Sequence, residues 1–203
     1  MRLGLFGGSF DPVHTGHLML AECCREQCQL DQVWFIPAAT APHKQQQVYS
    51  PDEQRVAMLK LAIAGHEGFA VSEIELERGG VSYTVDTLRA IAEQEKDAEL
   101  FLLMGADTLA DLANWHDPAG VCALATPVVV GRDDDGDPDY NVLAPLVDAD
   151  RLAEFQKCRV AMPAVEISSR EVRRRVAAGE SIRYQVPRAV EKYIETSGLY
   201  QAD

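Results

Sequence analysis

Short segments rich in apolar residues alternate along the chain with longer segments in which apolar residues recur every three or four positions. The short segments predict strands at Leu3–Phe6, Val33–Ile36, Phe69–Ile74, Leu100–Met104, Pro127–Val130 and Val160–Met162. The longer pattern predicts helices at Gly16–Cys28, Thr84–Gln94, Ser169–Ala178 and Pro187–Ser197. Strands that alternate with helices predict an α/β fold: a Rossmann-like, doubly wound parallel sheet with helices on both faces and a C-terminal helical segment.

Two helix starts are marked by capping signals. Ser50-Pro51-Asp52-Glu53 offers an N-cap serine, a proline at the first helical position and a returning glutamate. Ser168 and Glu171 form the same kind of capping box near the C-terminus. The sequence contains no internal repeat and no clear linker, so we expect a single domain over residues 1–203.

Composition and charge narrow the class of protein. The 203 residues are 47% hydrophobic and 25% charged, which is typical of a globular chain with a substantial core. The apolar stretch within Met1–Phe6 is too short for a secretory signal and no long apolar run follows, so we expect a soluble, cytoplasmic protein without membrane contact. A net charge of −13 repels polyanions and argues against a nucleic-acid partner. In such an acidic chain, any local cluster of basic residues becomes informative.

The cysteines and acidic residues do not predict a metal site made by the protein. Cys23, Cys24 and Cys28 fall on the first predicted helix without a paired C-x-x-C or a nearby histidine. Five cysteines also make no disulfide framework in a chain of this size, so we interpret them as reduced packing residues. The acidic segment Asp133–Asp139 lacks the terminal glutamate of a calcium loop and predicts an exposed loop.

A glycine turn followed by two histidines stands directly after the first predicted strand. The segment reads Gly7-Gly8-Ser9-Phe10-Asp11-Pro12-Val13-His14-Thr15-Gly16-His17. It is not a P-loop, because no Gly-Lys-Ser/Thr closes it, and it does not match G-x-G-x-x-G. His14 and His17 are placed at a helix start, where both rings can face one anion, and Gly16 lets a ligand approach the backbone. The alternative is that the glycines only turn the chain and the histidines only cap the helix or fill space.

The densest basic cluster lies near the C-terminus, in the segment Ile167-Ser168-Ser169-Arg170-Glu171-Val172-Arg173-Arg174-Arg175. The predicted helix start aims unpaired backbone N–H groups forward. Arg170, Arg173 and Arg174 recur at helical spacing and are expected on one face. By itself, a basic face in contact with water would explain this cluster.

Taken together, the two segments resemble the H-x-G-H and I-S-S-T-x-I-R motifs of the nucleotidylyltransferase superfamily. Arg170 departs from the usual threonine, so we assign it no role. The resemblance implies in-line attack of a substrate phosphate on the α-phosphorus of a nucleoside triphosphate, without a covalent intermediate. The implied catalytic residues are His14, His17 and Arg173. The implied ATP-binding residues are Gly7, Gly8, Ser9, Phe10, His14, Gly16, His17, Gly105, Asp107, Ile167, Ser168, Ser169 and Arg173.

The middle of the chain resembles one branch of that superfamily, the bacterial nicotinate mononucleotide adenylyltransferases. The resemblance is carried by Ser82-Tyr83-Thr84, Met104-Gly105-Ala106-Asp107 and Asn114-Trp115-His116. It implies that the Asp107 carboxylate takes the ribose hydroxyls of adenosine and that Trp115 stacks on the pyridine ring. The implied residues of the mononucleotide site are Ser9, Phe10, Lys44, Thr84, Trp115 and Arg132.

The activity that the resemblance implies is transfer of the adenylyl group of ATP to nicotinate mononucleotide, giving nicotinate adenine dinucleotide and pyrophosphate for NAD biosynthesis. Mg²⁺ is expected to accompany ATP. One alternative is another superfamily member, such as a phosphopantetheine adenylyltransferase, against which Asp107 and Trp115 argue. A non-catalytic nucleotide-binding protein on the same fold is the other alternative, and the intact His14 and His17 argue against it.

Overall fold

The protein is described by a computed structural model that covers residues 1–42, 49–132 and 138–201. Lys44 and most of the acidic segment, residues 133–137, lie outside the described residues. The side chain of Arg132 also lies outside them.

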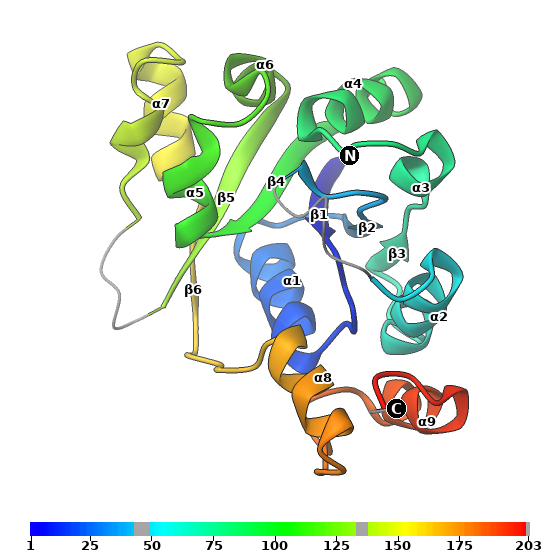
Figure 1. The fold of residues 1–203 in the computed structure, drawn as a ribbon. Helices are drawn as coiled ribbons and strands as arrows, with labels where there is room; N and C mark the ends of the chain where they lie inside the picture. Colours follow the sequence, from blue (N-terminus) through cyan, green and yellow to red (C-terminus); the bar gives the residue numbers. More distant parts are fainter. Residues whose placement is uncertain (43–48, 133–137, 202–203) are drawn as a thin grey trace.

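Within the described part of the chain, six parallel strands form one sheet in the order β3-β2-β1-β4-β5-β6 (Figure 1). The strands are β1 (Arg2–Gly8), β2 (Gln32–Pro37), β3 (Phe69–Val71), β4 (Glu99–Gly105), β5 (Ala125–Arg132) and β6 (Arg159–Met162). This order is that of a doubly wound dinucleotide-binding fold, with the reversal of winding between β1 and β4. The predicted Rossmann-like α/β fold is confirmed.

Helices cover both faces of the sheet (Figure 1). They are α1 (Thr15–Gln27), α2 (Asp52–Ala62), α3 (Ile74–Arg78), α4 (Thr84–Gln94), α5 (Ala106–Leu112), α6 (Pro118–Leu124), α7 (Ala149–Gln156), α8 (Ser169–Ala177), α9 (Arg188–Ser197) and a 3₁₀ helix η2 (Tyr140–Leu143). Alternate residues of β4 enter different cores: Leu103 packs with α1, α2, α8 and α9, whereas Leu102 packs with α4, α5 and α6. Because a strand such as β4 is buried on both faces, its sequence is a continuous run of apolar residues.

The predicted strand at Phe69–Ile74 was too long. The strand β3 ends at Val71, and Ile74 begins the short helix α3. The chain leaves the sheet after Ser72, whose N–H still bonds the Phe35 carbonyl at 3.0 Å. The sequence pattern also missed α5, α6 and α7, which have seven or eight residues each and are therefore too short to show clear helical periodicity.

The two predicted capping boxes have different outcomes. Ser168 caps α8 as expected, because its Oγ accepts the Glu171 N–H at 3.2 Å. The glutamate half of the box differs, since the Glu171 carboxylate accepts from Arg174 at 2.8 and 2.9 Å. The cap predicted at Ser50 was wrong: α2 begins at Asp52 without a side-chain capping bond. The Ser50 N–H instead donates to the Asp11 carboxylate at 3.2 Å, so tertiary contacts set the path of the chain into α2.

The cysteines are all unpaired, and Cys24 and Cys122 are buried, which agrees with the packing role that the sequence predicted. Across the residues that the structure describes, no helix is both long enough and apolar enough to cross a bilayer.

Candidate functional site

The candidate site lies at the carboxyl ends of β1 and β4, where the order of the sheet reverses. Open α/β sheets bind ligands at this point. A cavity of about 190 Å³ and another of about 290 Å³ open here, and Gly105 at the end of β4 lines both. The loop that leaves β1 carries the glycine turn and the two histidines past these cavities.

His14 and His17 form a stacked pair at the first turn of α1. Their ring centroids are 3.6 Å apart with an interplanar angle of 20°. The main-chain N–H of His14 donates to Nδ1 of His17 at 3.2 Å. Since Nδ1 of His17 accepts, a neutral ring carries its proton on Nε2, and this nitrogen is the donor that His17 offers to a ligand.

Both histidines are neutral in the ligand-free protein at pH 7. Burial lowers the pKa of His14 to about 4. Burial, and then the proximity of His14, lower the pKa of His17 well below its ordinary value. The pair can therefore donate hydrogen bonds to phosphate oxygens, but the positive charge that balances a triphosphate has to come from elsewhere.

The depressed pKa of His14 makes stability depend on pH. Between pH 6.5 and about 4 the unfolded chain binds a proton at this residue that the folded chain does not, so stability falls on acidification. We expect the wild-type protein to lose about 3 kcal/mol more than His14→Asn between pH 7 and 4, measured by denaturant unfolding. Asparagine is a good N-cap residue, so the start of α1 is preserved. Equal losses in the two proteins would contradict a depressed pKa of His14.

Phe10 supports the histidine pair from the core. It is 1% exposed and makes an edge contact with the His17 ring at 5.0 Å. Its φ of +47° is a left-handed conformation that costs a phenylalanine energy, so the surrounding packing must hold it there. Phe10 was predicted to bind ligand, and its buried side chain leaves only its backbone available for that role.

Gly16 is needed because a side chain would meet the His14 ring. A Cβ at this position would lie 3.2 Å from His14 Nδ1 and 3.6 Å from Val165 Cγ1. The His14 ring cannot retreat easily, since it is stacked on His17.

We expect Gly16→Ala to lower turnover by about tenfold, because a small misplacement of His14 is costly in an in-line reaction. Thermal stability should be unchanged or higher, since alanine favours a helix over glycine by roughly 1 kcal/mol. Steady-state kinetics and thermal unfolding of the same preparation check both parts. Parallel losses of activity and stability would contradict this explanation.

The basic helix α8 docks on the loop that carries the histidines. Arg173 Nη1 donates to the Asp11 carbonyl at 2.6 Å, and Ser169 Oγ donates to the Pro12 carbonyl at 2.8 Å. The two motifs from opposite ends of the chain therefore meet at one place, as a shared triphosphate site requires.

The predicted single basic face of α8 was wrong. Arg174 turns to the surface and pairs with Glu171 and Glu180 at 2.8 and 3.0 Å, whereas Arg173 turns to the loop. Arg170 is exposed. Helical spacing alone could not distinguish these directions, because the loop that attracts Arg173 is distant in sequence.

The smaller cavity gathers six of the thirteen residues expected to bind ATP: His14, Gly16, His17, Gly105, Asp107 and Ile167. Its lining is His14, Gly16, His17, Leu20, Gly105, Ala106, Asp107, Val130, Met162, Val165 and Ile167. Asp107 is exposed in the first turn of α5. Ser168 and Ser169 follow Ile167 in the chain but are not among the residues that line this cavity. The Ser168 hydroxyl oxygen accepts from the Glu171 N–H, and the Ser169 hydroxyl donates to the Pro12 carbonyl.

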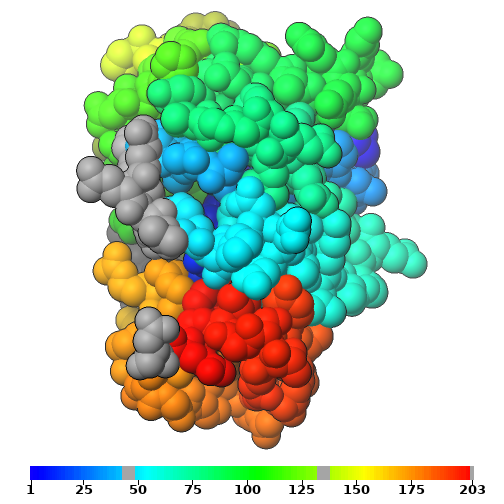
Figure 2. Space-filling view, turned by 45° about the vertical axis from the view of Figure 1, so that its right-hand side comes forward, coloured from blue at the N-terminus to red at the C-terminus, as the bar shows by residue number. Residues whose placement is uncertain are grey.

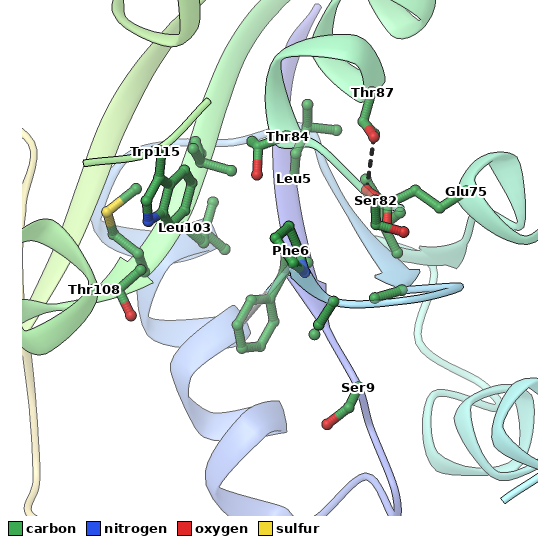
Figure 3. Close-up of a pocket in the computed structure, with 18 of the residues that line it drawn as sticks. Leu5, Phe6, Ser9, Glu75, Ser82, Thr84, Thr87, Leu103, Thr108 and Trp115 are labelled. Atoms are coloured by element: carbon green, nitrogen blue, oxygen red, sulfur yellow. Dashed lines mark hydrogen bonds between the residues drawn. The ribbon is translucent and has the colours of Figure 1, made fainter. Parts of the chain in front are cut away.

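The larger cavity gathers residues expected to bind the mononucleotide. Ser9 lines it just after β1, Thr84 lines it from α4, and Trp115 lines it from the segment after α5. Gly7 and Gly8, at the end of β1, also line this cavity, although they were expected to bind ATP. Figure 3 shows the Trp115 indole and the Thr84 side chain at this cavity, with Phe6 below them. Lys44 and the side chain of Arg132 lie outside the described residues, so their predicted roles stay predictions.

Two buried charged residues at the site, Glu75 and Arg55, were not predicted from the sequence. Glu75 is buried at the larger cavity and accepts a hydrogen bond from the Thr87 hydroxyl at 2.6 Å (Figure 3). Arg55 is 0% exposed and donates to the carbonyls of Ser9 and Ala38 at 2.9 and 2.8 Å. A charged residue within the apolar stripe of a helix is the signal that could have pointed to Arg55.

Comparison with known proteins agrees with this geometry. Residues 5–175 match the family model described as cytidylyltransferase-like. A probable nicotinate-nucleotide adenylyltransferase of Thermus thermophilus is 45% identical over 201 residues, which cover 99% of this chain and all of that one. A protein of the same description from Thermomicrobium roseum is 44% identical over 98% of this chain and 92% of its own length.

The fold also matches a solved structure, the Plasmodium falciparum nicotinic acid mononucleotide adenylyltransferase complexed with NaAD. The TM-score is 0.74, with 17% identity, over 98% of this chain and 97% of that one. At this level of identity the likeness concerns the fold.

Proposed function

This chain belongs to the nicotinate-nucleotide adenylyltransferase family, and from that premise we propose that it transfers the adenylyl group of ATP to nicotinate mononucleotide. The products are nicotinate adenine dinucleotide and pyrophosphate. The observation that carries the proposal is the arrangement of two adjoining cavities around Gly105, with His14 and His17 at one and Thr84 and Trp115 at the other. Two substrates bound in these cavities would meet at the end of β4, beside the histidines.

The reaction we propose is an in-line displacement at the α-phosphorus. A phosphate oxygen of the mononucleotide forms a bond to this phosphorus, and the bond to the bridging oxygen of the β-phosphate breaks, which releases pyrophosphate. The neutral rings of His14 and His17 donate hydrogen bonds to the oxygens that gain charge. Arg173 and the amino end of α8 balance the charge of the leaving pyrophosphate. Placement and charge balance suffice for this chemistry, so no covalent intermediate is needed.

The rest of the assignment follows the linings of the cavities and the family resemblance. Asp107 would accept the ribose hydroxyls of ATP in the smaller cavity. Trp115 would stack on the pyridine ring, and Thr84 with the first amides of α4 would receive its carboxylate. Lys44 and Arg132 are proposed for the mononucleotide on the resemblance alone.

Mg²⁺ enters this proposal as part of the MgATP substrate. Within the described ranges, no three His, Cys, Asp or Glu side chains are grouped so that they could hold a metal ion. The phosphates of ATP and water are therefore the expected ligands, and no step is assigned to the ion. A cytoplasmic location is part of the same proposal.

A coupled assay for the dinucleotide product tests the proposal. Nicotinate mononucleotide, nicotinamide mononucleotide and phosphopantetheine are each supplied with MgATP, and pyrophosphate release is recorded in parallel. We expect the highest kcat/KM with nicotinate mononucleotide. A preference for phosphopantetheine would assign the chain to another branch of the superfamily, and binding of ATP without turnover on any acceptor would favour a non-catalytic protein.

A further inference from the structure

Asp11, in the loop between β1 and α1, has a buried carboxylate whose partners come from distant parts of the chain. The residue is 2% exposed. Its Oδ1 accepts a hydrogen bond from the Tyr200 hydroxyl at 2.5 Å, and its Oδ2 accepts from the Ser50 N–H at 3.2 Å. Its carbonyl accepts from Arg173 at 2.6 Å. Three separate segments therefore hold one residue of the histidine loop.

Tyr200 reaches Asp11 because the chain reverses after α9. Gly198 adopts a φ of +65°, and the Leu199 N–H returns to the Ile194 carbonyl at 3.2 Å. Figure 2 shows the C-terminal segment, in red, lying against α2, in cyan. Burial, followed by the charge of Asp11, raises the pKa of Tyr200, so its hydroxyl remains a donor at all physiological pH values.

A shift of Asp11 would be transmitted to the histidines. Only Pro12 and Val13 separate Asp11 from His14. The Pro12 carbonyl accepts a hydrogen bond from Ser169, and Val13 is 0% exposed. The segment between Asp11 and His14 is therefore packed on its surroundings and cannot move independently of them. Closely packed interiors pass on small displacements rather than absorb them.

We propose that Tyr200 is a positioning residue of the adenylyl-transfer site, acting through the Asp11 carboxylate on His14 and His17. This role rests on the proposed function. Tyr200 itself lines neither cavity, so it does not contact the substrates. Without its hydroxyl, a buried carboxylate oxygen loses a donor and the carboxylate turns toward another partner, which moves the loop.

The test is Tyr200→Phe, which removes only the hydroxyl. We expect the single-turnover rate with saturating MgATP and nicotinate mononucleotide to fall by about tenfold or more, because small displacements of catalytic groups are costly. The KM for ATP should stay within roughly threefold, since the groups that act in the transition state are affected most. Far-ultraviolet circular dichroism and thermal unfolding confirm that the variant is folded at the assay temperature.

Tyr140→Phe is the matched control. Tyr140 is also buried, and its hydroxyl donates to the Cys158 carbonyl at 3.3 Å, beside β6 and away from both cavities. We expect a comparable loss of thermal stability with an unchanged turnover rate. This pair separates a positioning effect from a general loss of stability.

A double-mutant cycle tests the route through Asp11. If Tyr200 acts through that carboxylate, Tyr200→Phe should change the rate by less than twofold in an Asp11→Ala background, which lacks both carboxylate oxygens. Additive effects would overturn the route, and an unchanged rate in Tyr200→Phe alone would overturn the proposal. If Asp11→Ala does not fold, the rate of Tyr200→Phe compared with that of Tyr140→Phe tests the proposal. A wild-type protein without adenylyl transfer would instead reject the proposed function.

Discussion

Replacing His17 with alanine is expected to lower the turnover of adenylyl transfer by roughly 10²-fold or more, the usual effect of losing a donor to a developing phosphate charge. Nδ1 of His17 accepts a hydrogen bond from the main-chain N–H of His14, so the Nε2–H is the group that His17 can donate to the ligand. The same substitution also removes the ring on which His14 stacks. We expect kcat to fall much more than the affinity for ATP changes, because the interaction strengthens in the transition state.

The measurement is the single-turnover rate at saturating substrates, together with ATP binding by calorimetry. His66→Ala is a suitable control, because His66 stacks on Phe69 and bonds Glu22 at the opposite end of the strands. We expect the control to retain the wild-type rate. A His17→Ala variant that turns over within twofold of wild type would exclude the proposed role of the histidine.

Replacing Arg173 with alanine is the second large effect. Arg173 holds the Asp11 carbonyl at 2.6 Å and is proposed to balance the charge of the leaving pyrophosphate. We expect kcat/KM for ATP to fall by roughly 10²-fold or more, since a charged donor and a contact to the histidine loop are lost together. The kcat/KM of Arg173→Lys should lie between those of the wild type and of Arg173→Ala. An ammonium group keeps the charge but cannot donate in two directions through a planar fork.

Arg174→Ala is the matched control for this prediction. Arg174 is the next residue of the same helix, with its guanidinium paired at the surface to Glu171 and Glu180. Surface ion pairs contribute little, so we expect near-wild-type kinetics and only a small change in stability. If Arg173→Ala and Arg174→Ala lose activity equally, the total positive charge of α8 is what supports activity, and the specific role proposed for Arg173 is wrong.

Local sequence signals were sufficient for the positions of the strands, apart from the end of β3, for the longer helices and for the histidine segment of the site. The glycine turn and the spacing of His14 and His17 lie within one continuous segment at a strand–helix junction. Contacts of this kind depend on neighbours a few positions away, so residue type and periodicity predict them. The cap at Ser168 was predicted for the same reason and is confirmed.

Signals that depend on distant partners were not sufficient. Ser50 has the sequence of an N-cap, but its N–H is used by Asp11, which lies 39 positions away. Arg173 and Arg174 look equivalent along the helix, yet one turns to a loop 162 positions away and the other to nearby glutamates. The inward roles of Arg55 and Tyr200 are of the same kind, because their partners come from other elements.

By itself, the sequence determined the alternation of strands and helices, the glycine turn after the first strand as a place for ligands, and the two phosphate-binding motifs. Only the tertiary structure decided which basic side chain enters the site, how the C-terminal segment holds the histidine loop, and which cavity each predicted residue lines. The physical reason is the distance along the chain over which each effect acts. Backbone preference and apolar periodicity act over a few residues. Buried hydrogen bonds between remote segments form only where the packed sheet and helices bring their atoms within about 3 Å.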